Sequence, residues 1–205
     1  TSRQRKLVVA EMMEKVGLDQ IMINRYPHEL SGGQNQRVGI ARAMINGPKL
    51  IICDEAVSAL DVSIQAQVVN LLKDLQTEFG LSMIFISHDL VVVREISHRI
   101  LVLYLGRTVE LADRDTIYGD ARHPYTKSLI SAVPIPDPRI ERTRARIKLP
   151  GELPSPLDPG AALRFLPSRL ALGERNYVPK LSQVAPDHYV AEHDPLEDLL
   201  AGTAA

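Results

Sequence analysis

Apolar positions in this chain follow helical spacing in some stretches and form short unbroken runs in others. The helical spacing predicts four helices, at residues 5–16, 31–46, 64–79 and 90–96. The apolar runs predict strands at residues 50–53, 82–86 and 99–104, followed by a turn at Gly106 and an antiparallel return over 107–111. Because helices and strands alternate, we expect an α/β fold with a mostly parallel sheet and right-handed crossovers.

The strand at residues 50–53 is wholly apolar and lies between Pro48 and Asp54. This pattern is typical of a parallel strand that is buried on both faces, and the strand at 82–86 is expected to be buried as well. The helix between them follows Asp61 and Ser63, either of which can serve as its N-cap.

The amino-acid composition of the chain changes after about Gly119. Most of its 14 prolines lie from Pro124 onward, so a compact repeating core is not expected there. We predict two parts: a main domain over residues 1–120, and a proline-rich extension over residues 121–205 that wraps on the main domain and frays after about residue 194.

Composition and charge narrow the class of protein. With 205 residues, 45% of them hydrophobic, and a net charge of −1, the chain is long enough for one ordinary domain and a small appendage, and it is not an obvious nucleic-acid binder. No apolar run approaches the roughly 20 residues that cross a bilayer, and no signal peptide begins the chain, so we expect a cytoplasmic protein. Its single cysteine, Cys53, is expected to be buried and inert.

Candidate chemistry begins with the segment Leu30-Ser31-Gly32-Gly33-Gln34 at the start of the second predicted helix. Ser31 is a good N-cap, the glycines let backbone approach a ligand, and free N–H groups at a helix start attract anions. The segment therefore indicates phosphate binding. For Ser-Gly-Gly alone, a turn that only starts a helix is the better interpretation.

Three further motifs follow in order, and together they carry a resemblance. They are Asp54-Glu55 after the apolar strand, Ser58-Ala59-Leu60-Asp61, and Ser87-His88-Asp89 after the next strand. With the Leu-Ser-Gly-Gly-Gln segment, the chain resembles the ATP-binding subunit of ABC transporters, with its signature, Walker B, D-loop and H-loop motifs in that family's order and spacing. The resemblance implies an ABC ATPase, a P-loop NTPase fold, with ATP and Mg²⁺ as cofactors.

The resemblance also implies roles for single residues. Asp54 is the candidate magnesium holder, through a water, and Glu55 is the candidate general base for hydrolysis. His88 is expected to reach the γ-phosphate and hold the attacking water. Simpler roles remain open for each: a strand-end turn for the acidic pair, and a structural or exposed position for the histidine.

In this family the signature acts across a dimer. Ser31, Gly32, Gly33 and Gln34 of one subunit are expected to close over ATP held by the other, and Asp61 of the D-loop to couple the two sites. Asp61 could equally be only a helix cap. The expected partners are a second ABC ATPase subunit, identical or related, two membrane permeases and, indirectly, an extracytoplasmic solute-binding protein, which places the chain at the cytoplasmic face of the inner membrane.

The phosphate-binding loop of the family is absent from this sequence. A Gly-x-x-x-x-Gly-Lys-Ser/Thr motif does not occur, because the chain contains no Gly-Lys pair. The P-loop NTPase domain is thus expected to be incomplete, as in the C-terminal piece of a longer protein. We predict that these 205 residues alone neither bind ATP usefully at their own site nor hydrolyse it, and that the fragment exposes strand edges and aggregates.

The extension indicates the solute class. Segments 123–129, 132–138 and 151–156 resemble the C-terminal region of ATPases that serve oligopeptide and dipeptide importers. Many of those relatives carry a cysteine cluster after the Pro-Ser-Pro segment. Here no cysteine follows Cys53, so no iron–sulfur cluster is expected.

Three functions compete at this point. The leading one is the energy-coupling ATPase of a bacterial peptide importer. A second is an ABC-type ATPase without a membrane partner, acting on DNA or ribosomes; it would be favoured by coiled-coil insertions or tandem ATPase domains, and neither occurs. A third is a truncated, non-catalytic protein that docks on a permease or donates its signature motif in trans. The chemistry of the transported solute beyond this class is left open.

Overall fold

The chain divides into two compact units, Thr1–Ile96 and Ser97–Ala205, in a computed structural model that describes residues 1–135 and 137–201. The predicted domain boundary lies near residue 120, whereas this division falls between Ile96 and Ser97. Among the described residues, the strand that begins at Arg99 pairs with the strand at Arg107–Asp113, which comes later in the chain.

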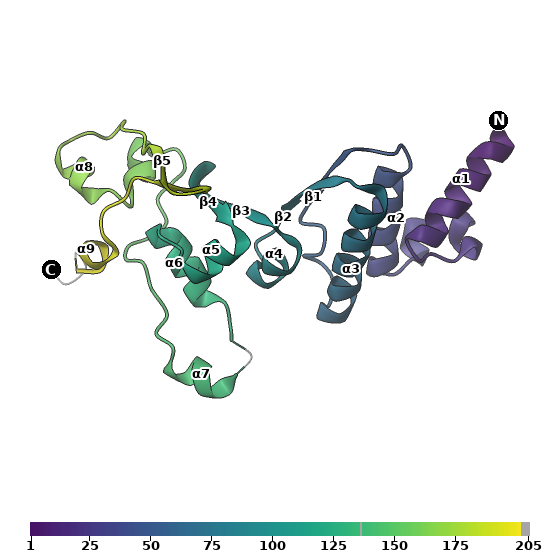
Figure 1. The fold of residues 1–205 in the computed structure, drawn as a ribbon, viewed down its shortest axis with the longest axis horizontal. Helices are drawn as coiled ribbons and strands as arrows, with labels where there is room; N and C mark the ends of the chain where they lie inside the picture. The colour runs from purple at the N-terminus through teal and green to yellow at the C-terminus, as the bar shows by residue number, and fades with distance from the viewer. Residues whose placement is uncertain (136, 202–205) are drawn as a thin grey trace. The chain divides into compact units, whose positions relative to one another are not determined.

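The first unit contains four helices, two short 3₁₀ segments and two strands (Figure 1). In chain order they are α1 (Ser2–Lys15), η1 (Gln20–Asn24), η2 (Pro27–Glu29), α2 (Gly32–Met44), β1 (Leu50–Asp54), α3 (Val62–Phe79), β2 (Ser82–Ile86) and α4 (Leu90–Ile96). The four helices and two strands predicted over this region are confirmed, with boundaries shifted by a few residues.

Strands β1 and β2 pair in parallel, from Leu50 opposite Ser82 to Asp54 opposite Ile86. The predicted burial of both faces is wrong. Ile51 and Cys53 are buried in the core, but Ile52 is 62% exposed and Ile84 is 48% exposed. Side chains alternate across a strand, and among the described residues helices cover only the face that carries Ile51 and Cys53.

The core of the first unit lies where α1, α2 and α3 pack beside one another and against the β1–β2 pair (Figure 1). Its fully enclosed side chains include Val16 from the end of α1, Met44 from α2, and Val68 and Leu72 from α3. Helix α3 starts at the Asp61 cap and ends at Gly80, whose φ of 59° is the left-handed conformation that glycine adopts without strain.

The second unit is built on an antiparallel sheet with the strand order β3-β4-β6-β5. Its elements are β3 (Arg99–Tyr104), β4 (Arg107–Asp113), α5 (Arg114–Gly119), α6 (Pro124–Ala132), α7 (Pro138–Thr143), η3 (Pro159–Leu163), α8 (Pro167–Ala171), β5 (Leu181–Ala185), β6 (His188–Ala191) and α9 (Leu196–Ala201). The α/β class is confirmed, and among the described residues β1 and β2 are the strands that pair in parallel. Tight turns join β3 to β4 and β5 to β6, and such turns require antiparallel neighbours.

The proline-rich region is more ordered than its composition indicated. Strands β5 and β6 extend the β3–β4 hairpin, and the expected fraying after residue 194 is not what the described residues show, because α9 follows and its Leu199 is buried with Phe165 and Tyr104. No helix in residues 1–135 or 137–201 is long and apolar enough to span a membrane.

Candidate functional site

The start of α2 is held by a reciprocal pair of hydrogen bonds. The backbone N–H of Gln34 donates to Ser31 Oγ at 3.2 Å, and the backbone N–H of Ser31 donates to Gln34 Oε1 at 2.9 Å. This capping box confirms Ser31 as the N-cap. The same bond engages Gln34 Oε1 as an acceptor and so fixes the orientation of the Gln34 side chain.

The two glycines after Ser31 lie against the start of α3 and the residue just before its cap. A Cβ added to Gly33 would come within 2.6 Å of Ile64 Cγ2, and one added to Gly32 within 3.4 Å of Leu60 Cδ2. Glycine at position 33 is therefore required for α2 to approach α3 this closely. The signature segment and the first turn of α3 form one packed contact.

Asp61 caps α3 at that same contact. Its Oδ1 accepts the backbone N–H of Ile64 at 3.0 Å and the hydroxyl of Ser63 at 2.7 Å. The Ser63 hydroxyl bond, followed by the backbone bond, lowers the pKa of the Asp61 carboxyl, so the cap is ionised near neutral pH. Of the two candidate caps, the structure selects Asp61, and Ser63 supports it.

The acidic pair lies at the carboxyl end of β1. Asp54 is the last residue of the strand and is exposed. Glu55 follows with a φ of 51°, in the left-handed region that non-glycine residues rarely adopt. Its N–H donates to Ile86 O at 3.0 Å, and its carbonyl accepts from the N–H and the hydroxyl of Ser58. These bonds hold Glu55 in its strained turn.

Glu55 and His88 meet at the ends of the two parallel strands. His88 Nδ1 lies 2.8 Å from Glu55 Oε1. The side chains remain open to solvent, with exposed fractions of 75% for His88 and 43% for Glu55. Separation of these two residues onto different faces would have ruled out a joint role, and the structure instead brings them into direct contact.

The contact changes the titration of both groups. The hydrogen bond from His88 lowers the pKa of the Glu55 carboxyl, and the same bond raises the pKa of the His88 imidazole. The ionised carboxylate beside a protonated imidazole is therefore the favoured state at mildly acidic pH. Because both side chains are exposed, solvent screens the pair and its weight in stability is small.

The loop that carries His88 is held by hydrogen bonds to the next residue, Asp89. Asp89 Oδ1 accepts the backbone N–H of Val91 at 2.9 Å, which caps α4, and Asp89 Oδ2 accepts from Gln65 Nε2 at 3.0 Å. Gln65 belongs to α3, so α3 supports both the signature contact and the His88 loop. Sequence reasoning did not identify Gln65 or Asp89 in this role; the Asp one residue before a predicted helix was the available signal.

Arg37 is a second bridging residue. Its Nη1 donates to Val16 O at the end of α1, and its Nη2 lies 3.4 Å from Gln67 Oε1 on α3. These contacts give Arg37 a structural role on α2. The structure shows that role as a link between three helices.

The predicted site residues thus form two groups. Ser31, Gly32, Gly33, Gln34 and Asp61 gather where α2 meets α3, and Glu55 and His88 pair beyond the strand ends with Asp54 beside them. Within residues 1–135 and 137–201, no hydrogen bond or ion pair joins a side chain of one group to a side chain of the other.

A magnesium ion would find few ligands in this chain. No cluster of three or more His, Cys, Asp or Glu side chains suited to a metal occurs in the described part of the chain. Mg²⁺ is commonly bound by one or two carboxylates together with waters and substrate phosphates. The exposed carboxylate of Asp54 fits such a site as a single ligand, with the phosphates of a nucleotide as the others.

Sequence reasoning missed a buried polar cluster in the second unit. Glu110 is fully buried and accepts hydrogen bonds from the backbone N–H groups of Arg122 and His123, and its Oε1 lies 2.7 Å from His188 Nε2. The available signal was an acidic residue flanked by Val109 and Leu111 in a predicted strand.

Two family models match the chain. The model described as "ABC transporter" matches residues 2–58, and the model described as "Oligopeptide/dipeptide transporter, C-terminal region" matches residues 109–168. The first match contains the signature segment and the acidic pair. The second begins in β4 and ends in α8.

Curated relatives match at high identity. The oligopeptide transport ATP-binding protein OppF of Haemophilus influenzae is 64% identical over 157 residues, which cover 77% of this chain and 47% of that protein. The putative oligopeptide transport ATP-binding protein YkfD of Bacillus subtilis is 51% identical over 197 residues, which cover 94% of this chain and 59% of that protein. The chain spans about half the length of the curated relatives it matches.

Solved structures share the fold over about half of the chain. The ATP-binding cassette MJ0796, in a dimeric post-hydrolysis state bound to ADP and Pi, matches with a TM-score of 0.50 and 33% identity over 56% of this chain and 49% of that one. CbiO1 from Clostridium perfringens, part of the transporter complex cbiONQ, matches with a TM-score of 0.53 and 25% identity over 58% and 47% of the two chains.

Proposed function

Because this chain is a relative of the ATP-binding subunits of oligopeptide and dipeptide ABC transporters, we propose that it is part of the subunit that couples ATP hydrolysis to peptide import in a bacterium. The observation that carries the proposal is the contact of Glu55 with His88 at the ends of two parallel strands. Hydrolysis of a terminal phosphate needs a base and a second polar group at one point in space, and this pair provides both.

Each side chain has a chemical task in this proposal. Glu55, kept ionised by His88, orients the attacking water and accepts its proton. His88 holds the carboxylate in position and donates to the terminal phosphate when nucleotide arrives. Asp54 holds a magnesium ion, which supplies charge neutralisation on the phosphates when it is bound.

The signature segment acts on a nucleotide held by a second subunit in this proposal. Ser31 and the free N–H groups at the start of α2 bind the phosphates of that nucleotide, since the positive end of a helix favours anions. Asp61 lies at the same contact and couples the two sites. Nucleotide bound between two subunits favours the closed dimer, and its hydrolysis removes that preference.

The relatives support a proposal for the assembly and its solute. We propose that the chain works in a pair with a like or related ATPase, beneath two permease subunits at the cytoplasmic face of the membrane, with a solute-binding protein on the other side. Peptides are the proposed solute for two reasons. The family model of the oligopeptide/dipeptide transporter C-terminal region matches residues 109–168, and the relatives are named as oligopeptide transport proteins.

The test is ATP turnover in the assembled transporter. Glu55→Gln should lower turnover by about 100-fold or more, the usual contribution of a general base, with an unchanged melting temperature. The matched control is Glu78→Gln. Glu78 lies at the C-terminal end of α3, where its exposed carboxylate pairs with Lys15 of α1, so this change should leave turnover unchanged. Full activity in Glu55→Gln would reject the assignment.

A second candidate is a non-catalytic partner that lends its signature in trans. One structural observation supports it: in the described residues the signature segment packs on the start of α3 and makes no side-chain bond to Glu55 or His88. The 205-residue chain should then show no ATP turnover alone but raise the turnover of a complete partner subunit, and Ser31→Arg should abolish that stimulation. Saturable turnover by the chain alone, lost in Glu55→Gln, would exclude this candidate.

A further inference from the structure

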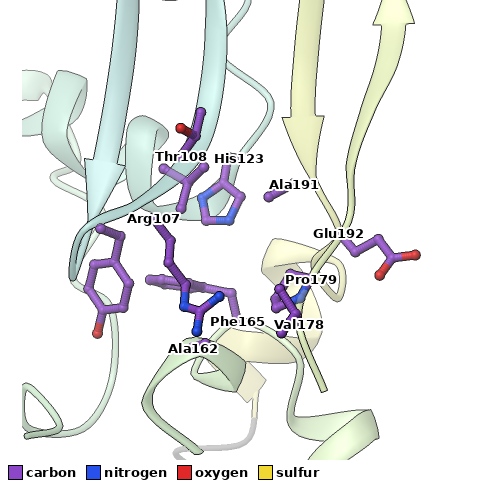
Figure 2. Close-up of a pocket in the computed structure, with 11 residues that line it drawn as sticks. Arg107, Thr108, His123, Ala162, Phe165, Val178, Pro179, Ala191 and Glu192 are labelled. Carbon is purple, nitrogen blue, oxygen red and sulfur yellow. The ribbon is translucent and has the colours of Figure 1, made fainter. Parts of the chain in front are cut away.

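A pocket with a volume of about 250 Å³ opens in the second unit, and its lining includes none of the proposed ATPase residues. Its walls come from the β3–β4 hairpin, the residue before α6, the η3–α8 segment and the β5–β6 hairpin (Figure 2). Segments far apart in the sequence therefore converge on it. Nothing in the proposed ATPase mechanism uses this pocket.

Arg107 supplies the positive charge of the pocket. It lies at the start of β4, and Figure 2 shows its guanidinium reaching into the space below the His123 ring and beside Phe165. Arg107 is exposed, and within residues 1–135 and 137–201 its side chain has no hydrogen bond or ion pair. An arginine aimed at a pocket without a carboxylate partner is suited to bind an anion from solution.

Glu192, the acidic residue of the lining, does not neutralise Arg107. Its carboxylate points away from the pocket in Figure 2, and Oε2 accepts the Tyr177 hydroxyl and the backbone N–H of Lys180. These bonds lower the pKa of Glu192 and keep it engaged on the far side of the β5–β6 hairpin. The pocket itself therefore keeps a net positive character.

His123 adds a neutral donor. The ring is 1% exposed, and the backbone N–H of Tyr125 donates to its Nδ1 at 3.2 Å, so in the neutral ring the hydrogen resides on Nε2. Burial, reinforced by His193 nearby, lowers the pKa of His123 to about 3, so the ring is uncharged near neutral pH. Glu110 fixes its backbone by accepting the His123 N–H at 3.1 Å.

The remaining walls are apolar and aromatic. The Phe165 ring lies 4.9 Å from the His123 ring and 5.0 Å from the Tyr104 ring, both in edge-to-face geometry. Val178 and Pro179 form the opposite wall. An apolar cavity of about 150 Å³ is enough to hold benzene, so this pocket has room for a ring and one small polar group.

We propose that this pocket binds a small carboxylic acid with an apolar body, of about ten non-hydrogen atoms, with its carboxylate on Arg107 and its body against Phe165. The carboxylate forms a charge-assisted pair with the guanidinium and accepts the His123 Nε2–H. The apolar body fills the space between Phe165, Val178 and Pro179. This site is independent of the ATPase role.

The probe is phenylacetate, and its matched control is phenylacetamide, which has the same shape without the charge. Titration of the isotope-labelled 205-residue chain, followed by NMR, should shift the signals of Arg107, His123 and Phe165 first. Phenylacetate should bind at least about tenfold more tightly than the amide, because a charge-assisted pair is roughly twice as strong as a neutral hydrogen bond. Equal binding of the two, or shifts centred elsewhere, would overturn the proposal.

Variants locate the charge. Arg107→Gln should weaken phenylacetate binding by about tenfold or more and leave the amide unchanged. Arg99→Gln removes an exposed arginine from the neighbouring strand outside the pocket and should leave both unchanged. Circular dichroism and the NMR spectrum of the β3–β4 hairpin confirm folding of both variants. Undiminished phenylacetate binding in folded Arg107→Gln would refute the proposal, and absence of binding to the unsubstituted chain would do the same.

Discussion

The His88 imidazole should titrate above its ordinary pKa of about 6.5, since Glu55 accepts its hydrogen bond. Histidine NMR resonances followed against pH measure this directly. Glu55→Gln should return the His88 pKa toward its ordinary value, whereas Glu78→Gln should not move it. An unchanged pKa in Glu55→Gln would mean that the two side chains do not interact in solution.

The sign of the stability effect follows from the two shifts. The raised pKa of His88 adds to the free energy of unfolding below about pH 6.5, and this stabilisation is lost as pH rises through the pKa of His88 in the folded chain. The lowered pKa of Glu55 adds to the free energy of unfolding above about pH 4.3, and this stabilisation is lost as pH falls through the pKa of Glu55 in the folded chain. The pair therefore stabilises most between these limits, weakly, because solvent screens it.

His123 should make the chain acid-sensitive. Its pKa is about 3 in the folded chain against about 6.5 when unfolded, so below pH 6.5 the unfolded state binds a proton that the folded state does not. Stability should fall by up to about 1.4 kcal/mol per pH unit between these values. His123→Asn keeps a side-chain cap for α6 and should flatten this slope in urea titrations at several pH values. An identical slope in both proteins would contradict the assignment.

Among single residues, the sequence predicted those in motifs and missed those whose partners lie far away in the sequence. Asp54, Glu55 and His88 stand at strand ends, where apolar runs stop abruptly, and this placement identified them. Glu110 and His188 pair across 78 positions of sequence, and no local pattern indicates which histidine will meet a carboxylate buried in a strand. Only the pairing of β4 with β6 brings them together.

The close approach of α2 to α3 depends on the absence of a Cβ at Gly33. Gly33→Ala would place a Cβ 2.6 Å from Ile64 Cγ2, and overpacking of this kind costs about 1–3 kcal/mol. Alanine favours helix by about 1 kcal/mol, so the packing cost should win and lower the melting temperature.

Gly39→Ala on the same helix is the matched control for this contact. A Cβ there meets nothing within 4 Å, so Gly39→Ala should stabilise the chain by about 1 kcal/mol. The measurement is thermal unfolding of both variants beside the unsubstituted chain. If both alanines stabilise, α2 does not lie on α3 as described.

Substitution can distinguish two roles of Asp61, as a cap of α3 and as a residue that couples two subunits. Asp61→Asn keeps a side chain that caps α3, while Asp61→Ala removes the cap. If the residue serves only α3, the melting temperature should drop in the alanine variant alone and ATP turnover in the assembled transporter should be unchanged in the asparagine variant. If it couples the two subunits, turnover should fall in both.

Helices and strands were predicted well in the first unit because their signals are local: capping residues, glycine stops and apolar periodicity. The second unit shows the limit of such signals. Strands β5 and β6 are short and follow a proline-rich stretch, and their main stabilisation is pairing with β4, far away in sequence. Proline frequency indicated an irregular extension, whereas long-range pairing produces a four-stranded sheet.

For the molecule as a whole, the uncovered face of β1 and β2 should control solubility. Ile52 and Ile84 sit at facing positions of the two strands, and both are about half or more exposed. Exposed apolar strand surface promotes association. Ile52→Thr with Ile84→Thr should raise the concentration at which light scattering detects aggregates, because threonine keeps the β-branched shape and adds a hydroxyl.

A matched control for this effect is Leu157→Thr. Leu157 is 92% exposed and belongs to a turn outside the sheet, so its replacement should change scattering little. Equal effects of the control and the double variant would show that general surface hydrophobicity, rather than this face, limits solubility.

The backbone of Glu55, with φ at 51°, carries one more consequence. Glycine would adopt this conformation at ease, so Glu55→Gly should fold more robustly than Glu55→Ala while lacking the carboxylate entirely. Selection for thermal robustness alone would therefore drive this position toward glycine. A glutamate at this position is expected if its carboxylate serves the proposed hydrolysis, and the left-handed backbone is then a local strain that the fold retains.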